Sequence, residues 1–308
     1  MTGETDLFCP VCETIREVDL IGTYRNKNKL FSSKELYKCE SCGIIFINTM
    51  PASDHLDTYY RDVWLNDENI ISTSEDMEIN YEIQAEERVK YLKRFIKNIN
   101  NLKVLDIGSG YGYLYDSFNK MGFKDVRYFA TDSNHENLAS MAARGINAYK
   151  DLGEVAEKDF DLITLCFVLE HVSDPVGFLK DALKYLKKNG LLFIDLPERD
   201  DTFKAILEPH LLVFTTKSLN YLIAKLGLKN LDLTGYGIER SKLIENLTFK
   251  KKVLNKFVAL VNRIKRIEYK LLTFEMIKKK KRSELYRLYK YNEEGRDRWW
   301  IRAIAVKE

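Results

Sequence analysis

Apolar positions along this chain occur in two patterns, short continuous runs and longer stretches in which they recur every three or four residues. The runs are typical of buried strands, and the recurring spacing is typical of amphipathic helices. The predicted strands are residues 103–107, Val126–Ala130, Asn147–Tyr149, a run that begins at Phe160, Leu191–Leu196, Asn230–Tyr236 and Arg298–Val306. The predicted helices are Tyr81–Asn98, Leu114–Met121, Gly177–Leu186 and Thr216–Leu226. A polar Lys-Lys-Asn-Gly segment, Lys187–Gly190, is expected to end the third helix.

This alternation of strands with helices is typical of a parallel sheet. We expect an α/β fold with a doubly wound, seven-stranded Rossmann-like sheet. We divide the chain into an N-terminal module (1–60), a core (61–237), a helical insertion between strands six and seven (238–297) and a final core strand (298–308). The composition, with 45% hydrophobic and 31% charged residues, excludes collagen-like, mucin-like and wholly disordered proteins.

The apolar runs argue against a membrane span. The longest, Leu165–Leu169 and Phe257–Val261, are far shorter than the ~20 residues that a bilayer requires. The first residues, Met-Thr-Gly-Glu-Thr-Asp, have neither the basic start nor the apolar centre of a secretory signal. We therefore expect a cytoplasmic protein.

Four of the five cysteines form two Cys-x-x-Cys pairs, Cys9 with Cys12 and Cys39 with Cys42. Two such pairs can bring four thiolates around one tetrahedral ion, and the polar sequence between them has too few large apolar residues for a core of its own. The alternatives are two disulfides, which a cytoplasmic chain disfavours, or two redox pairs, which the lack of a strand-then-helix context disfavours. We expect a structural Zn²⁺. The fifth cysteine, Cys166, is expected to be a small buried hydrophobic side chain.

A glycine-rich turn follows the first core strand. Residues 103–112 read Lys-Val-Leu-Asp-Ile-Gly-Ser-Gly-Tyr-Gly, with Asp106 before Gly108, Gly110 and Gly112. The turn lacks the last glycine of a dinucleotide fingerprint and the Gly-Lys-Ser/Thr ending of a P-loop. It resembles motif I of class I S-adenosylmethionine-dependent methyltransferases. The resemblance implies S-adenosylmethionine as the cofactor, with its methionine part against the bare glycine backbone and its ammonium group near Asp106.

Acidic residues also follow the next two strands. Asp132 is expected to accept hydrogen bonds from the ribose hydroxyls of the cofactor, and its alternative role is to cap the helix that begins nearby. Asp151 and Leu152 follow the third strand, where the resemblance implies that an acid and the next backbone N–H bind adenine. The alternative for Asp151 is an acid in a solvated loop.

The fourth strand and its exit loop strengthen the resemblance. Residues 160–175 are similar to the Phe-Asp…Leu-Glu-His…Asp-Pro signature of the small-molecule branch of this family. The motifs typical of methylation of base amino groups or of cytosine C5 are missing. The resemblance implies that Glu170 contacts the cofactor. For His171 three roles are open, a base, a cofactor contact or a loop stabiliser, and we favour the last two.

The segment from His210 to Thr215 resembles a stretch of zinc-module methyltransferases that modify sugars. The resemblance implies that His210 accepts the proton of the acceptor hydroxyl, as neutral imidazole can near pH 7; the alternative is that it caps the following helix. In the sugar C-methyltransferases an acid usually stands where Pro209 stands here. We therefore expect O-methylation of a saccharide, sugar-nucleotide or polysaccharide hydroxyl. Sugar C-methylation, RNA methylation and a non-catalytic cofactor-binding role are the alternatives.

The net charge of +3 conceals a strongly basic segment. Residues 239–308 contain 21 Lys and Arg but nine Asp and Glu. Between residues 253 and 272 apolar side chains recur every three or four positions among the basic ones, and Lys278–Arg282 is wholly basic, which predicts a pair of amphipathic helices. We expect these helices to form a lid or a homodimer arm, to contact anionic lipid or a lipid-linked acceptor at a membrane surface, or to bind RNA.

Overall fold

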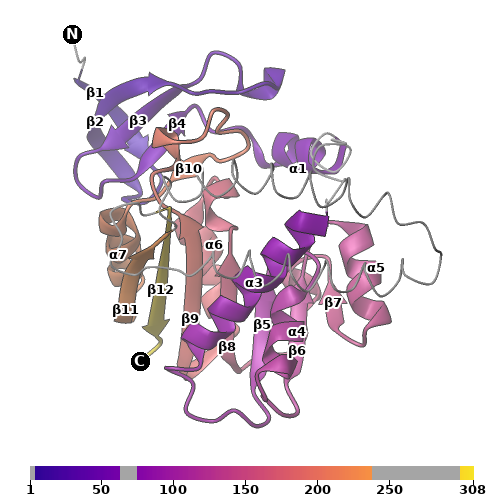
Figure 1. Ribbon diagram of the computed structural model, residues 1–308. Helices are drawn as coiled ribbons and strands as arrows, with labels where there is room; N and C mark the ends of the chain where they lie inside the picture. The colour runs from indigo at the N-terminus through magenta and orange to yellow at the C-terminus, as the bar shows by residue number, and fades with distance from the viewer. Residues whose placement is uncertain (1–3, 63–74, 238–298) are drawn as a thin grey trace, which may run out of the picture.

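The computed structural model describes residues 4–62, 75–237 and 299–308, which form two β-sheets and the helices around them (Figure 1). The insertion predicted at 238–297 lies outside these residues. The α-helices in the described ranges are α1 (Ser53–Asp62), α3 (Glu75–Leu92), α4 (Tyr113–Lys120), α5 (His135–Ala143), α6 (Pro175–Leu183) and α7 (Thr216–Lys225). None of these helices is both long enough and apolar enough to cross a bilayer.

The larger sheet has seven strands and confirms the doubly wound α/β fold expected from the sequence. From one edge to the other they are β11 (Lys229–Tyr236), β12 (Trp300–Val306), β9 (Leu186–Pro197), β8 (Phe160–Cys166), β5 (Lys103–Ile107), β6 (Arg127–Thr131) and β7 (Asn147–Tyr149). Strands β5 to β9 run parallel to one another, whereas β12 is antiparallel to both β9 and β11. The chain leaves β5 toward β6 on one side and later crosses to β8 on the other, so the sheet has a switch point at the end of β5.

Alternating side chains of β5 show how helices cover both faces of this sheet. Val104 packs in one apolar cluster with Val89 of α3 and Phe118 of α4. The next residue, Leu105, belongs to a second cluster that contains Leu179 of α6. Because successive side chains of a strand point to opposite faces, burial of both Val104 and Leu105 requires such cover on both sides of the sheet.

The structure corrects the predicted boundary between α6 and β9. The segment Lys187–Gly190 does not end a helix: α6 already ends at Leu183, and these residues lie within β9. They form an irregular part of the strand, in which Asn189 has φ +61° and the register with β8 shifts. Partners remote in the sequence hold this segment, because the N–H of Asn189 donates to the carbonyl of Lys307 at 2.7 Å, and the N–H of Lys307 donates to the carbonyl of Gly190 at 3.1 Å.

A smaller antiparallel sheet lies beyond one end of the larger one (Figure 1). Its strands, in spatial order, are β1 (Glu4–Cys9), β2 (Thr14–Thr23), β3 (Glu35–Cys39), β4 (Ile45–Asn48) and β10 (Leu212–Val213). Strand β10 comes from the core sequence, and Leu212 pairs with Phe46 while Val213 pairs with Ile45. Apolar residues of both parts share one continuous cluster. The N-terminal module therefore completes its sheet with a strand that begins two residues after His210.

Candidate functional site

The loop after β5 is shaped as a cradle at the switch point of the larger sheet. Its three glycines, Gly108, Gly110 and Gly112, have φ angles of +68°, +56° and +72°, which side chains rarely adopt. A Cβ on Gly108 would lie 2.6 Å from a methyl group of Val168, so this turn packs too closely for any larger residue. A Cβ on Gly110 would meet no protein atom within 4 Å, so bare backbone borders open space there.

Asp106 lies beneath this loop and is held by the neighbouring strands. Its carboxyl group is 3% exposed and accepts hydrogen bonds from the Tyr128 hydroxyl and from Thr164 Oγ1, both at 2.5 Å. Burial raises the pKa of Asp106 to about 6, although both hydrogen bonds oppose that shift. Its predicted contact with the cofactor ammonium stays a prediction, because both oxygens already have partners within the sheet.

Asp132 connects the glycine loop to the start of α5. One carboxylate oxygen accepts a hydrogen bond from the N–H of Gly110 at 2.7 Å, and the other accepts from the N–H of Asn134 at 2.9 Å. The helix cap is Asn134, whose side chain accepts from the first turn of α5, so Asp132 does not cap this helix. Burial raises the pKa of Asp132. Asp132, which is predicted to bind the ribose, therefore lies directly beside the glycine loop.

Asp151 and Leu152 lie in the loop after β7. The carboxylate of Asp151 is exposed and caps a short turn by accepting a hydrogen bond from Gly153 N–H at 2.8 Å. The carbonyl of Leu152 accepts from the Tyr185 hydroxyl at 2.5 Å. These contacts give Asp151 a local structural role, and adenine binding by the two residues stays a prediction.

The turn after β8, Leu169–His171, brings two buried titratable groups together. Glu170 is 2% exposed, and neither of its carboxyl oxygens has a hydrogen-bond partner among the described residues. Burial raises its pKa to about 8, so its carboxyl group is neutral at pH 7. Burial also keeps the pKa of His171 well below its ordinary value, and its Nδ1 lies 3.0 Å from the hydroxyl of Tyr60 in α1. His171 thus joins the core to the N-terminal module.

His210 forms the most strongly organised polar contact of the site. Its Nδ1 lies 2.5 Å from Oδ2 of Asp200, which is 1% exposed, and its Nε2 lies 3.1 Å from the Lys204 ammonium. The imidazole packs edge to face on His171, with ring centroids 4.7 Å apart. One polar atom each from His210, His171 and Glu170 lie within 4.8 Å of one another. Several ionisable groups therefore converge at the carboxyl end of β8.

The electrostatics keep His210 neutral and Asp200 ionised. Burial lowers the pKa of His210, and the hydrogen bond that His210 donates to Asp200 only partly opposes this shift. Burial alone would raise the pKa of Asp200, but its contacts with His210 and Lys204 outweigh burial and lower it. A neutral imidazole whose Nδ1–H donates to a carboxylate carries its lone pair on Nε2. This is the protonation state of a general base.

Helix capping is not the role of His210. The N-cap of α7 is Thr215, whose side chain and that of Ser218 form a reciprocal capping box. His210 precedes this helix by several residues and is fixed instead by the carboxylate of Asp200.

Arg88 of α3 is a second buried ion that the sequence alone did not single out. Its Nε donates to the carboxylate of Asp195 in β9 at 2.6 Å, and its guanidinium lies 4.6 Å from the ring centroid of Phe167, just after β8. One terminal nitrogen of Arg88 has no partner among the described residues. The guanidinium can therefore bind an anion at the ends of these strands.

The four cysteines of the N-terminal module converge as the sequence predicted. The sulfurs of Cys9 and Cys42 are 3.6 Å apart, those of Cys12 and Cys39 are 3.9 Å apart, and none forms a disulfide. Four sulfurs bound tetrahedrally at about 2.3 Å lie about 3.8 Å from one another, so the cluster fits a structural Zn²⁺. The disulfide alternative is thereby excluded in this structure. Cys166, expected to be a small buried hydrophobic side chain, is partly buried at the end of β8 and packs against the apolar cluster on one face of the sheet.

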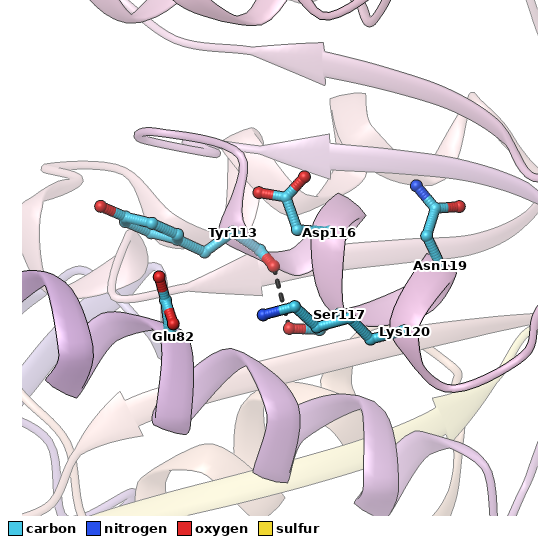
Figure 2. A pocket seen from close by; sticks show the side chains of 6 residues that line it. All are labelled: Glu82, Tyr113, Asp116, Ser117, Asn119 and Lys120. Carbon is cyan, nitrogen blue, oxygen red and sulfur yellow. Dashed lines mark hydrogen bonds between the residues drawn. The ribbon is translucent and has the colours of Figure 1, made fainter. Parts of the chain in front are cut away.

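A cavity of about 330 Å³ lies between α3 and α4 and contains none of the predicted site residues. Figure 2 shows its polar lining, Glu82 on one helix and Tyr113, Asp116, Ser117, Asn119 and Lys120 on the other. Ser117 Oγ donates to the carbonyl of Tyr113 at 3.0 Å. This cavity belongs to the outer helix layer, whereas the groups around His210 lie at the ends of the strands.

Comparison with known proteins assigns the family. Residues 80–233, half of the chain, match the family described as "Methyltransferase domain". The chain belongs to this family. The match contains the glycine loop, Asp132, Glu170 and His210.

The relatives of this methyltransferase domain are named for different reactions. The chain is 35% identical over 107 residues to the ubiquinone biosynthesis O-methyltransferase of Parvibaculum lavamentivorans, an alignment that covers 33% of this chain and 42% of the relative. It is 28% identical over 166 residues to the tRNA U34 carboxymethyltransferase of Campylobacter jejuni, covering 51% and 56% respectively. The chain spans about half the length of the curated relatives it matches.

A solved structure supports the fold of the methyltransferase. Phosphoethanolamine N-methyltransferase 2 of Haemonchus contortus, in complex with S-adenosyl-L-methionine, superposes with a TM-score of 0.50 at 14% identity. The superposition covers 95% of this chain and 69% of that one. Together with the family match, this confirms the expected class I S-adenosylmethionine-dependent methyltransferase domain.

Sequence reasoning missed Asp200, Lys204 and Arg88. In the sequence, Glu198-Arg-Asp-Asp201 is a polar segment, but nothing local indicates that Asp200 folds back on a histidine ten residues later. Arg88 appears in the sequence as one of several basic residues on an amphipathic helix. Only the packing of α3 on the sheet shows that it is buried.

Proposed function

We propose that this methyltransferase transfers a methyl group to a hydroxyl oxygen, with the Asp200–His210 pair removing the hydroxyl proton. The observation that carries the proposal is the 2.5 Å contact between His210 Nδ1 and Asp200, inside a site that also holds Glu170 and His171. Asp200 fixes the imidazole and stabilises its positive charge once it has accepted the proton. An acid of the preceding loop thus accompanies His210, although Pro209 stands where the sugar C-methyltransferases usually carry an acid.

The residues around the cradle are suited to S-adenosylmethionine. This cofactor supplies an electrophilic methyl group bound to a sulfonium ion. The bare backbone at Gly110 leaves room for a ligand, and Asp132 beside it would bind the ribose. The guanidinium nitrogen of Arg88 that has no partner among the described residues suits the cofactor carboxylate. His210 then deprotonates the acceptor oxygen, which makes that oxygen a better nucleophile.

The names of the relatives bear on the chemical class of the acceptor. The relatives named for ubiquinone biosynthesis are O-methyltransferases, which supports a hydroxyl acceptor. Their names do not support the saccharide acceptor that we expected from the sequence, and a ring hydroxyl of a phenol has the same requirement for a base. We therefore propose that the acceptor is a hydroxyl group of a small molecule. Whether that molecule is a saccharide or a phenol is decided by experiment.

The test combines an acceptor screen with two variants. Methyl transfer from labelled S-adenosylmethionine is measured with nucleotide sugars, lipid-linked saccharides, small phenols and RNA. With the acceptor found, His210→Ala should lower kcat about 10²- to 10⁴-fold but retain cofactor affinity by calorimetry. The control His135→Ala, at an exposed position, should behave as the wild type. A near-normal rate for His210→Ala would remove His210 as the base, and transfer to RNA alone would refute the small-molecule acceptor.

A further inference from the structure

Arg25, two residues beyond β2, reaches from the N-terminal module into the loop that carries Asp200 and His210. Its Nη2 donates to the carbonyls of Asp201 at 2.7 Å and Lys204 at 2.8 Å, and its Nε also donates to the Lys204 carbonyl at 3.2 Å. One guanidinium therefore ties together two backbone positions just after Asp200.

The same segment of the module holds the other end of the loop. The carbonyl of Arg25 accepts a hydrogen bond from the N–H of Leu207 at 2.8 Å. The carboxylate of Glu208 accepts from the backbone N–H groups of Lys27 at 2.7 Å and Asn28 at 2.8 Å, and from the Tyr59 hydroxyl at 2.7 Å. The loop is thus fixed by the module immediately before His210 as well.

Within the loop, backbone hydrogen bonds link the residues that the module holds, Lys204 and Leu207, to Asp200 and His210. The N–H of Lys204 donates to the carbonyl of Asp200 at 2.9 Å, and the N–H of His210 donates to the carbonyl of Leu207 at 2.9 Å. Residues 203–211 contain no regular helix or strand that could fix the spacing between Asp200 and His210. The position of the pair therefore depends on what holds the loop from outside.

We propose that Arg25 is a positioning residue that keeps Asp200 in hydrogen-bonding register with His210. The N-terminal module then has a function beyond its own metal cluster, because it assembles the proton-accepting pair of the core. This inference rests on the proposed function, in which that pair serves as the base.

The experiment replaces Arg25 in the full-length protein. Arg25→Ala should lower kcat about ten- to a hundred-fold, since an error of about 1 Å in a reacting group costs that order of rate, while cofactor affinity and zinc content stay unchanged. Arg25→Lys, whose ammonium can donate to the same carbonyls, should recover part of the rate. Arg16→Ala, a change at an exposed arginine of the same module, is the matched control and should have no effect.

Two readouts separate positioning from a general loss of stability. The first is the low-field proton resonance of His210 Nδ1–H, assigned by its absence in His210→Ala, which should shift or broaden in Arg25→Ala. The second is the pH profile of kcat, whose inflection should move to lower pH as His210 loses the Asp200 contact. The other ionisable groups that face His210, which are Lys204, His171 and Glu170, are unchanged in the variant.

The outcomes distinguish this inference from the proposed function. An unchanged resonance in Arg25→Ala would overturn the inference, whether or not kcat falls. A shifted resonance with an unchanged kcat would support Arg25 as the residue that positions the pair but would refute the pair as the base. If Arg25→Ala does not fold, Arg25→Lys and Arg25→Gln supply the same two readouts.

Discussion

At the scale of single residues, the site is made of buried ionisable groups whose charge is decided by their partners. Asp200 and His210 are both buried, but burial prevails only at His210, whose pKa is lowered even though Asp200 opposes the shift, whereas contacts with His210 and Lys204 lower the pKa of Asp200 and keep it ionised. Glu170 is equally buried but has no hydrogen-bond partner among the described residues, and burial raises its pKa to about 8. A buried carboxyl group can therefore be an anion, as in Asp200, or a neutral acid, as in Glu170, depending on whether a hydrogen-bond donor faces it.

The isolated carboxyl of Glu170 predicts a pH-dependent stability. Because its pKa is about 8 in the folded protein and about 4.5 when unfolded, the folded state binds the proton more tightly. Its contribution is complete below pH 4.5 and is lost as the pH rises to about 8, by up to ~1.4 kcal/mol per pH unit. In thermal unfolding without cofactor, Glu170→Gln should therefore gain stability relative to the wild type between pH 5 and 8, and then level off.

The control for this prediction is Glu136→Gln, a change at an exposed acid in α5. It should track the wild type across the same pH range. Parallel stability curves for wild type and Glu170→Gln would contradict the raised pKa.

At the scale of elements, each strand end and its following loop act as a unit. The loop after β5 is the clearest case, because its three glycines adopt left-handed backbone and one of them borders open space. The sequence predicted this loop correctly, since motif, strand and helix are adjacent in the chain. It could not predict that the two oxygens of Asp106 are held by β6 and β8, which are remote in sequence.

Replacement of Gly110 tests this loop. Gly110→Val places a branched side chain at φ +56° and in the open space of the cradle, so cofactor binding should be lost in calorimetry. Gly122→Val is the matched control, because Gly122 has φ +81° and also no atom within 4 Å of an added Cβ, but it lies at the far end of α4. The control should lose stability and keep its cofactor affinity. Unchanged affinity in Gly110→Val would refute the assignment of the loop.

Other element boundaries were predicted with unequal success, for the same physical reason. Residues 103–107 and Asn147–Tyr149 are strands as predicted, because their apolar pattern is local. The start of β9 was wrong because it depends on hydrogen bonds to Lys307. Strand β10 was not predicted at all: two residues carry no periodicity, and they are extended because they pair with β4.

At the scale of the whole molecule, the N-terminal module and the core form one structure. They share a sheet through β10 and an apolar cluster, and Lys225 of α7 donates to the carbonyl of Cys12 at 2.8 Å. The site itself takes Tyr60 from the module and Glu170, His171 and His210 from the core. Unfolding of the N-terminal module should therefore also displace the residues of the site.

Metal removal tests this coupling. Reduced protein should contain about one zinc per chain by elemental analysis, and Cys42→Ser should lose it. Since zinc binding contributes directly to folding, the variant should lose about 5 °C or more in Tm and should also lose methyl transfer through displacement of β10 and His210. Cys166→Ser, outside the cluster, should keep its metal. Absence of zinc from the reduced wild type would reject the metal assignment.

The sequence by itself determined the fold class, the glycine loop, the four cysteines and His210 as a candidate, because each depends on residue type and spacing over a short stretch. Tertiary structure alone decided which acid accompanies His210, that Arg88 is buried with one nitrogen unpartnered within the described part of the chain, and that Arg25 holds the loop between Asp200 and His210. Those contacts join residues from separate elements. Their geometry is set by how sheets and helices pack, and packing leaves no local pattern in the chain.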